Sequence, residues 1–168
     1  MTVNRRQVLG TLVAATSAVA LAGCGFQLRR VQPLKFQSVE LAGFPSHSTL
    51  EHQLRLAIES TGTKVVESLP EAEVVLKCLA EVREQVAAVT TAAGQTRELS
   101  LRLRFRFRLT RVRDDNVLIK DSEIALARDL TYNETDALAK QQEADFLYRA
   151  MQADLVDQVM RRLASVAF

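Results

Sequence analysis

The 168-residue chain is poor in the residues that build most catalytic and metal sites. It has only two cysteines, Cys24 and Cys78, and two histidines, His47 and His52. The histidines are five residues apart, whereas two zinc ligands on one helical face are four apart. The sequence has no glycine-rich phosphate loop, no Gly-x-Ser-x-Gly elbow and no cysteine pair at metal-ligand spacing. We therefore predict a protein that is not an enzyme and that binds no metal.

Long apolar runs are also scarce. The run from Val8 to Ala22 spans about 15 residues and contains threonine and serine, whereas a membrane span needs about 20 apolar residues. The run follows Arg5-Arg6 and leads into the sequence Leu-Ala-Gly-Cys, in which Cys24 is the cysteine of a lipobox. We therefore expect a lipoprotein signal peptide over residues 1–23 and a covalent lipid on Cys24. The alternative is an uncleaved membrane anchor with an incidental cysteine, and the arginine pair leaves both Sec and twin-arginine export open.

The expected mature chain has no excess charge and no disulfide. Loss of residues 1–23 removes two of the 22 basic side chains and leaves 20 basic against 20 acidic ones. A neutral, exported chain is a poor match for nucleic acid, whose phosphates favour basic proteins. Once Cys24 is lipidated, Cys78 has no disulfide partner within the chain. The remaining length suits one domain, which we place at residues 35–168 after a lipidated tether over residues 24–34.

Hydrophobic periodicity predicts four strands and two helices. The expected strands cover residues 36–41, a stretch from Val74, residues 99–109 and residues 117–132. One helix begins at a capping box formed by Ser48 and Glu51, and the other runs from about Asp136 to the end. In the strand that begins at Val74, simple alternation places the apolar side chains on one face. These are Val74, Leu76, Cys78, Ala80 and Val82. The same alternation directs another set to the opposite face: Lys77, Glu81 and Arg83.

The strand over residues 99–109 alternates apolar residues with arginines. The arginines are Arg102, Arg104, Arg106 and Arg108. Two amphipathic helices can cover only one face of the sheet, so the arginines are expected on the other face. This predicts an α+β two-layer sandwich with a mixed, mostly antiparallel four-stranded sheet and two helices packed on one face.

This arginine row is the feature that points most directly to function. Guanidinium groups bind phosphates or carboxylates in a forked manner, so the row suits a phosphorylated glycolipid or an acidic protein wall. The ordinary alternative is a solvated face neutralised by Asp121, Glu123 and Asp129 across the next hairpin. The residues themselves leave these alternatives open.

Short motifs along the mature chain resemble the LptE family of lipopolysaccharide-assembly outer-membrane lipoproteins. They are Cys24-Gly25-Phe26-Gln27-Leu28-Arg29, Gly94-Gln95-Thr96, and Asn133 with Ala137-Leu138-Ala139-Lys140, Glu143, Tyr148 and Met151. The resemblance implies a non-enzymatic partner of LptD, the outer-membrane β-barrel that delivers lipopolysaccharide to the cell surface. The lipoprotein would plug the barrel, assist its assembly and bind lipopolysaccharide. Gly25 fits an outer-membrane destination, since the familiar inner-membrane retention signal is Asp at this position.

The resemblance also implies candidate ligand residues. By position, Lys140 is the first candidate for lipopolysaccharide. The connection before Gly94 can carry a basic residue in this family but is Ala92-Ala93 here, so part of the contact is expected at Arg97 or on the arginine row. The alternative function is a lipid-anchored periplasmic adaptor that binds a soluble protein through the arginine-rich face.

Overall fold

The computed structural model describes residues 33–168. The predicted signal peptide and the lipidation site at Cys24 lie outside the described residues. The strands are β1 (Ser38–Ala42), β2 (Lys64–Val66), β3 (Val74–Thr90), β4 (Thr96–Arg111) and β5 (Val117–Thr131). The helices are α2 (Thr49–Glu59) and α3 (Ala137–Ala164), with short 3-10 turns η1 (Leu69–Glu71) and η2 (Glu134–Asp136).

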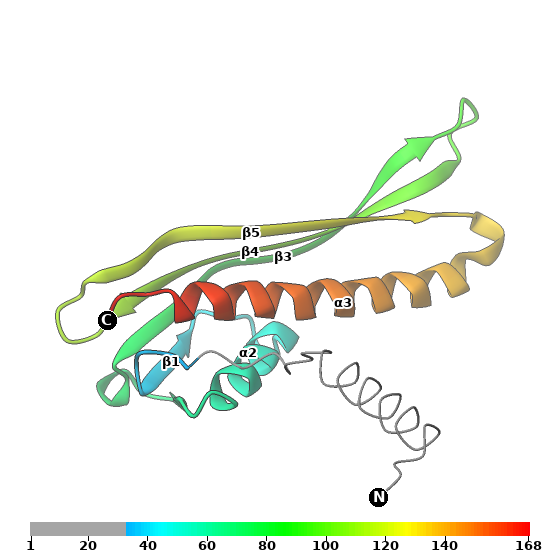
Figure 1. Ribbon diagram of the computed structural model, residues 1–168. Coiled ribbons are helices and arrows are strands. Elements are labelled where there is room, and N and C mark those ends of the chain that lie inside the picture. The colour runs from blue at the N-terminus through cyan, green and yellow to red at the C-terminus, as the bar shows by residue number, and fades with distance from the viewer. Residues whose placement is uncertain (1–32) are drawn as a thin grey trace, which may run out of the picture. The chain divides into compact units, whose positions relative to one another are not determined.

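The strands form one mixed sheet with the order β2-β1-β3-β4-β5 (Figure 1). Strand β1 is parallel to both β2 and β3, whereas β3, β4 and β5 are antiparallel. Both helices pack on one face of this sheet, which confirms the α+β two-layer sandwich (Figure 1). The predicted strand number was one too low. Strand β2 has only three residues, too few to display a hydrophobic period.

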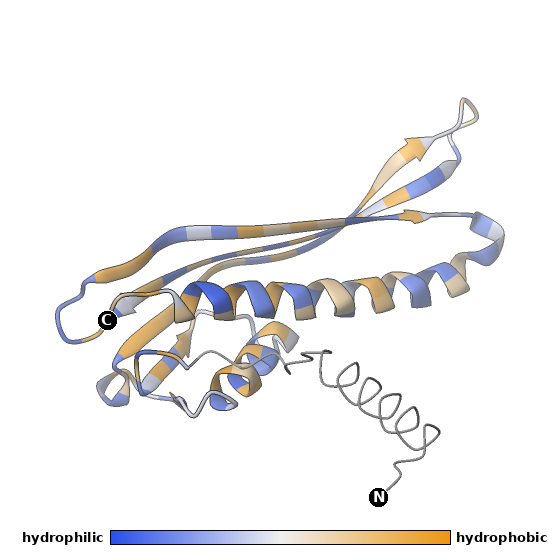
Figure 2. Cartoon of the chain, in the orientation of Figure 1, coloured by the Kyte–Doolittle hydropathy of each residue, from blue (hydrophilic) through white to orange (hydrophobic). Residues whose placement is uncertain are grey.

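The helices bury the apolar stripes that the sequence predicted. Ser48 caps α2, its hydroxyl accepting a hydrogen bond of 3.1 Å from the Glu51 amide. Helix α2 buries Leu50, Leu54 and Ile58. Helix α3 shows apolar bands among polar ones in Figure 2, and its buried residues are Ala144, Tyr148, Met151, Leu155, Val156, Val159 and Leu163. Between the layers, the stacked rings of Phe105 and Phe107 lie 5.2 Å apart.

A β-bulge at Leu79 reverses the faces of the β3 side chains from Ala80 to Ala87, where the register shifts again. Cys78 lies opposite Phe107 and Ala80 lies opposite Arg106, so one extra residue is inserted on β3. The predicted alternation is therefore correct up to Cys78 and wrong beyond it. Ala80 and Val82 lie on the arginine face, whereas Glu81 lies opposite the inward Phe105.

The bulge brings charged side chains of β3 to the helical layer. The Glu81 carboxylate accepts a hydrogen bond of 2.7 Å from the Ser48 hydroxyl at the start of α2. Further along, the Arg83 guanidinium stacks on the Tyr148 ring of α3 at 3.8 Å and forms an ion pair of 2.7 Å with Asp145. The Tyr148 hydroxyl donates to the Glu84 carbonyl oxygen. These polar contacts fix α3 along β3, beyond the part of the sheet that α2 covers (Figure 1).

Candidate binding surfaces

The predicted arginine row is present on the outer face of the sheet. Along β4, all four arginines are exposed and the residues between them are buried. The buried residues are Leu101, Leu103, Phe105, Phe107 and Leu109, each no more than 5% exposed. The arginines form a row because successive side chains of a strand point to opposite faces of the sheet. One face of β4 packs on the apolar core and the other is in solvent.

The four arginines differ in their partners. Arg104 forms an ion pair of 3.2 Å with Glu84 of β3, and Arg108 forms one of 2.6 Å with Asp121 of β5. The hydrogen bond from Arg108 lowers the pKa of Asp121. By contrast, Arg102 and Arg106 make no ion pair and no side-chain hydrogen bond with any residue from 33 to 168. The row therefore alternates between arginines that form an ion pair and arginines that form none, although Arg106 also lowers the pKa of Asp121 through its charge.

The predicted neutralising carboxylates are only partly where the sequence placed them. Asp121 pairs with Arg108 as expected, and Glu123 lies opposite Arg106 without forming an ion pair. Asp129 lies opposite Ser100, not opposite an arginine. Glu84 is a partner that sequence reasoning missed, because only the bulge at Leu79 brings its side chain to this face.

The neighbours of the arginine row on β3 and β5 are a mixture of small and charged side chains. Ala80 and Val82 of β3 lie opposite Arg106 and Arg104, and Ala125 of β5 lies opposite Arg104 on the other side. Ala127 continues this pattern opposite Arg102. Of the four arginines, only Arg104 has a small residue opposite it on both sides, since Glu84 lies opposite Arg102 and Glu123 lies opposite Arg106.

Lys140 lies on the other side of the sheet. It is in the first turn of α3, with its side chain 24% exposed and its ammonium group 2.9 Å from the Glu143 carboxylate. Arg97 is exposed, and the alternation of β4 places it on the same face as Leu99, which packs against the core. The fold thus places Lys140 and Arg97 on the helical side and separates both from the arginine row.

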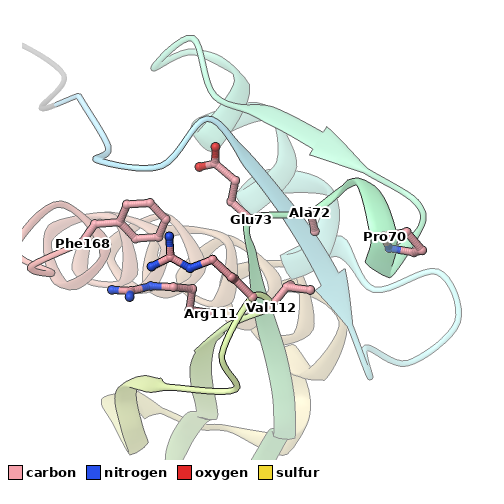
Figure 3. A pocket seen from close by; sticks show the side chains of 7 residues that line it. Pro70, Ala72, Glu73, Arg111, Val112 and Phe168 are labelled. Atoms are coloured by element: carbon pink, nitrogen blue, oxygen red, sulfur yellow. The ribbon is translucent and has the colours of Figure 1, made fainter.

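A pocket that was not predicted from the sequence lies beside Phe168. It has a volume of about 580 Å³ and is lined by Pro70, Ala72, Glu73, Arg111, Val112, Arg113 and Phe168 (Figure 3). The Arg111 guanidinium forms an ion pair of 3.2 Å with Asp114 and lies 4.9 Å from the centre of the Phe168 ring. Glu73 accepts a hydrogen bond of 2.8 Å from the Gln37 amide. These charged groups are therefore engaged in contacts that hold the fold.

Residues 33–168 contain no cluster of side chains suited to a metal ion. In the same range, none of the helices combines the length and the apolar character needed to span a bilayer. Cys78 is 6% exposed and packs in the core, as its apolar position predicted. Burial, with a smaller contribution from Glu81, raises the pKa of its thiol to about 11, which suppresses the reactive thiolate.

Comparison with protein families gives a match over residues 36–163, from the first buried residue of the described domain to Leu163 in the last turn of α3. The matching family is LptE, described as lipopolysaccharide-assembly. The chain belongs to the LptE family. This is a family of non-enzymatic lipopolysaccharide-assembly lipoproteins. No curated protein matches the chain.

Solved structures with the same fold include three bacterial lipoproteins. An uncharacterized lipoprotein B from Nitrosomonas europaea is 30% identical, with a TM-score of 0.71 over 84% of this chain and 91% of that one. The rare lipoprotein B from Shewanella oneidensis is 20% identical, with a TM-score of 0.64 over 76% and 94%. A minor lipoprotein from Acinetobacter baumannii is 22% identical, with a TM-score of 0.63 over 81% and 99%. The last two comparisons support the LptE-type fold alone.

Proposed function

We propose that this LptE-family chain is an outer-membrane lipoprotein, anchored by a lipid on Cys24, that plugs and helps assemble the LptD β-barrel. In this role it binds lipopolysaccharide during transport to the outer leaflet. The observation that carries the proposal is the family match, which spans the folded domain from residue 36 to residue 163. A charged outer sheet face supports it, since the interior of an outer-membrane barrel is polar.

For the lipopolysaccharide contact, we propose Lys140 together with Arg97. Both lie on the helical side of the sheet, near the end where β5 leads into α3. Lipopolysaccharide carries phosphates, and an ammonium or guanidinium group binds phosphate through charge-assisted hydrogen bonds. The Glu143 carboxylate beside Lys140 fixes the ammonium group at 2.9 Å and leaves its other two N–H groups for a ligand. The arginine row is a second candidate surface.

Co-purification from membranes tests the plug. The lipidated chain should be isolated in a stable complex with an integral outer-membrane β-barrel. Isolation with soluble proteins alone would contradict the plug and would favour the periplasmic adaptor.

Binding to purified lipopolysaccharide tests the ligand site. Lys140→Asp should weaken lipopolysaccharide binding about tenfold or more. Added salt should weaken lipopolysaccharide binding by the protein without substitutions. Lys64→Asp makes the same charge change at an exposed residue of β2 and is the matched control, which should leave binding within about twofold. Equal binding by Lys140→Asp and the control, with normal melting curves, would reject Lys140 as a ligand residue.

A further inference from the structure

The chain enters the folded domain at one end of the sheet. The buried Phe36 ring lies 6.1 Å from the ring of Phe168, which follows the end of α3. The Gln37 amide donates to Glu73, which directly precedes β3. The end of β4 pairs with the start of β3, so the β4–β5 turn lies at the same end (Figure 1). We call this part of the domain the entry end, and define it as residues 33–37, 69–73, 111–117 and 165–168.

The expected tether is shorter than the domain. Nine residue steps separate Cys24 from Pro33, and an extended chain advances by no more than about 3.6 Å per residue. The lipid attachment therefore lies within about 32 Å of the entry end. Helix α3 has 28 residues and is about 42 Å long, with Lys140 at the opposite end of it. The tether thus holds the entry end near the membrane in every orientation of the domain, but does not hold the other end there.

Large apolar side chains are exposed at the entry end. Leu69 is 51% exposed, Val117 is 42% exposed and Phe168 is 47% exposed. The pocket beside Phe168 opens at this end, and Pro70 and Val112 contribute to its apolar lining (Figure 3). Apolar and aromatic side chains gain free energy when they enter the boundary between lipid headgroups and acyl chains. A domain tethered to a bilayer at this end can bring them there.

Charges at the entry end are nearly balanced. Lys35 and Arg113 are exposed and form no ion pair or side-chain hydrogen bond with another residue of the described range 33–168. Glu71 and Asp115 are exposed acids at the same end. Attraction to an anionic surface is therefore weak, and apolar insertion supplies most of the contact. A guanidinium group beside apolar side chains still suits a phospholipid surface, because it can bind a headgroup phosphate while its neighbours enter the acyl boundary.

We propose that the entry end rests on the phospholipid surface that holds the Cys24 lipid. Leu69 and Phe168 lie among the headgroups, and Arg113 binds a headgroup phosphate. This inference rests on the lipidation in the proposed function and not on the barrel. A bilayer is the occupant because the tether keeps one within about 32 Å of these side chains at all times. The contact leaves Lys140 near the other end of α3, up to about 36 Å along the helix from the entry end.

Two labelled variants test which end of the domain meets the lipid. The lipidated chain is reconstituted into vesicles of phosphatidylethanolamine and phosphatidylglycerol that contain a lipid with a short-range quencher on its headgroup. Leu69→Cys and Leu138→Cys carry the same environment-sensitive fluorophore, and Leu138, which is 77% exposed near the start of α3, is the matched control. Cys78 is buried and does not compete for the label. The label at position 69 should lose intensity to the quencher and shift its emission to shorter wavelength, whereas the label at position 138 should do neither.

Matched double variants test the named side chains. In the Leu69→Cys chain, Phe168→Ser with Arg113→Gln should remove most of the quenching. Phe146→Ser with Arg149→Gln makes the same two changes at exposed positions of α3 and should leave the quenching unchanged. Melting curves of both variants check that the domain stays folded. The comparison of the two label positions decides the proposal even if one double variant does not fold.

Each result supports or overturns the contact. Equal quenching at the two label positions, or none at either, would overturn it and leave the proposed lipidation intact. Quenching at position 69 that persists in the folded variant with Phe168→Ser and Arg113→Gln would also overturn it, because the tether alone would then bring this end to the membrane. A Cys24 that carries no lipid, as measured by mass spectrometry of the purified protein, would reject the lipidation and this inference together.

Discussion

Gly43 lies directly against the backbone of Cys78. A Cβ atom built on Gly43 would be 2.8 Å from the Cys78 carbonyl oxygen, a distance that real Cβ contacts do not reach. Gly43 also has a φ of +76°, in the left-handed region. The loop after β1 therefore packs on β3 immediately before the bulge at Leu79, and only glycine fits there.

Gly43→Ala should destabilise the domain more than Gly94→Ala. Gly94, in the β3–β4 turn, has a similar φ of +80°, but an added Cβ would meet nothing within 4 Å. Gly94→Ala should therefore cost about 1 to 2 kcal/mol for the left-handed conformation alone, whereas Gly43→Ala adds a backbone clash. Urea unfolding of both variants measures the difference. Equal free energies of unfolding would contradict the close packing at Cys78.

The two faces of β4 give a second prediction. Phe105 is fully buried and stacks on Phe107, so Phe105→Ala should cost about 3 to 5 kcal/mol of unfolding free energy. Arg104 is exposed and contributes one surface ion pair, so Arg104→Ala should cost about 1 kcal/mol or less. Thermal or urea unfolding of both variants tests this. Similar losses at the two positions would contradict the one-sided sheet.

Much of this fold could be predicted because its long elements have clear periods. The alternation over residues 99–109 and the apolar stripe of α3 both placed the correct side chains in the core. The bulge at Leu79 could not be predicted, because Ala80 and Val82 are apolar and continue the expected period by chance. The short strand β2 was missed because parallel pairing with β1 is a non-local interaction.

Less of the binding surfaces could be predicted. The sequence placed the four arginines on one exposed face, since that depends only on alternation within one strand. It could not show which arginines have partners, because the ion pair of Arg104 with Glu84 depends on the bulge in another strand. It also gave no reason to separate Lys140 from the row, since that separation follows from the position of α3 on the other face (Figure 1).

The ion pair of Arg108 with Asp121 gives a pH-dependent prediction. The hydrogen bond from Arg108 holds the pKa of Asp121 below its ordinary value. Asp121 therefore has a lower pKa in the folded state than in the unfolded state. Its ion pair stabilises the fold fully at pH values above the unfolded-state pKa, and this stabilisation is lost as the pH falls through the folded-state pKa. Arg108→Gln should therefore raise the pKa of Asp121 and weaken this part of the acid dependence. Carboxyl NMR titration measures the shift, and an unchanged pKa in the variant would contradict the ion pair.

The final prediction concerns the anchor, which the sequence places outside the core. The buried residues of the domain begin at Phe36, twelve positions after the expected lipidation site at Cys24. A chain expressed from residue 24 without the signal peptide and with Cys24→Ala should therefore be soluble and keep the melting temperature of the lipidated protein in detergent. Circular dichroism and thermal unfolding of the two forms measure this. The lipid should instead determine whether the protein stays on the membrane, because each buried acyl methylene contributes about 0.8 kcal/mol to membrane binding. An unfolded Cys24→Ala domain would show that residues 35–168 do not form an independent core.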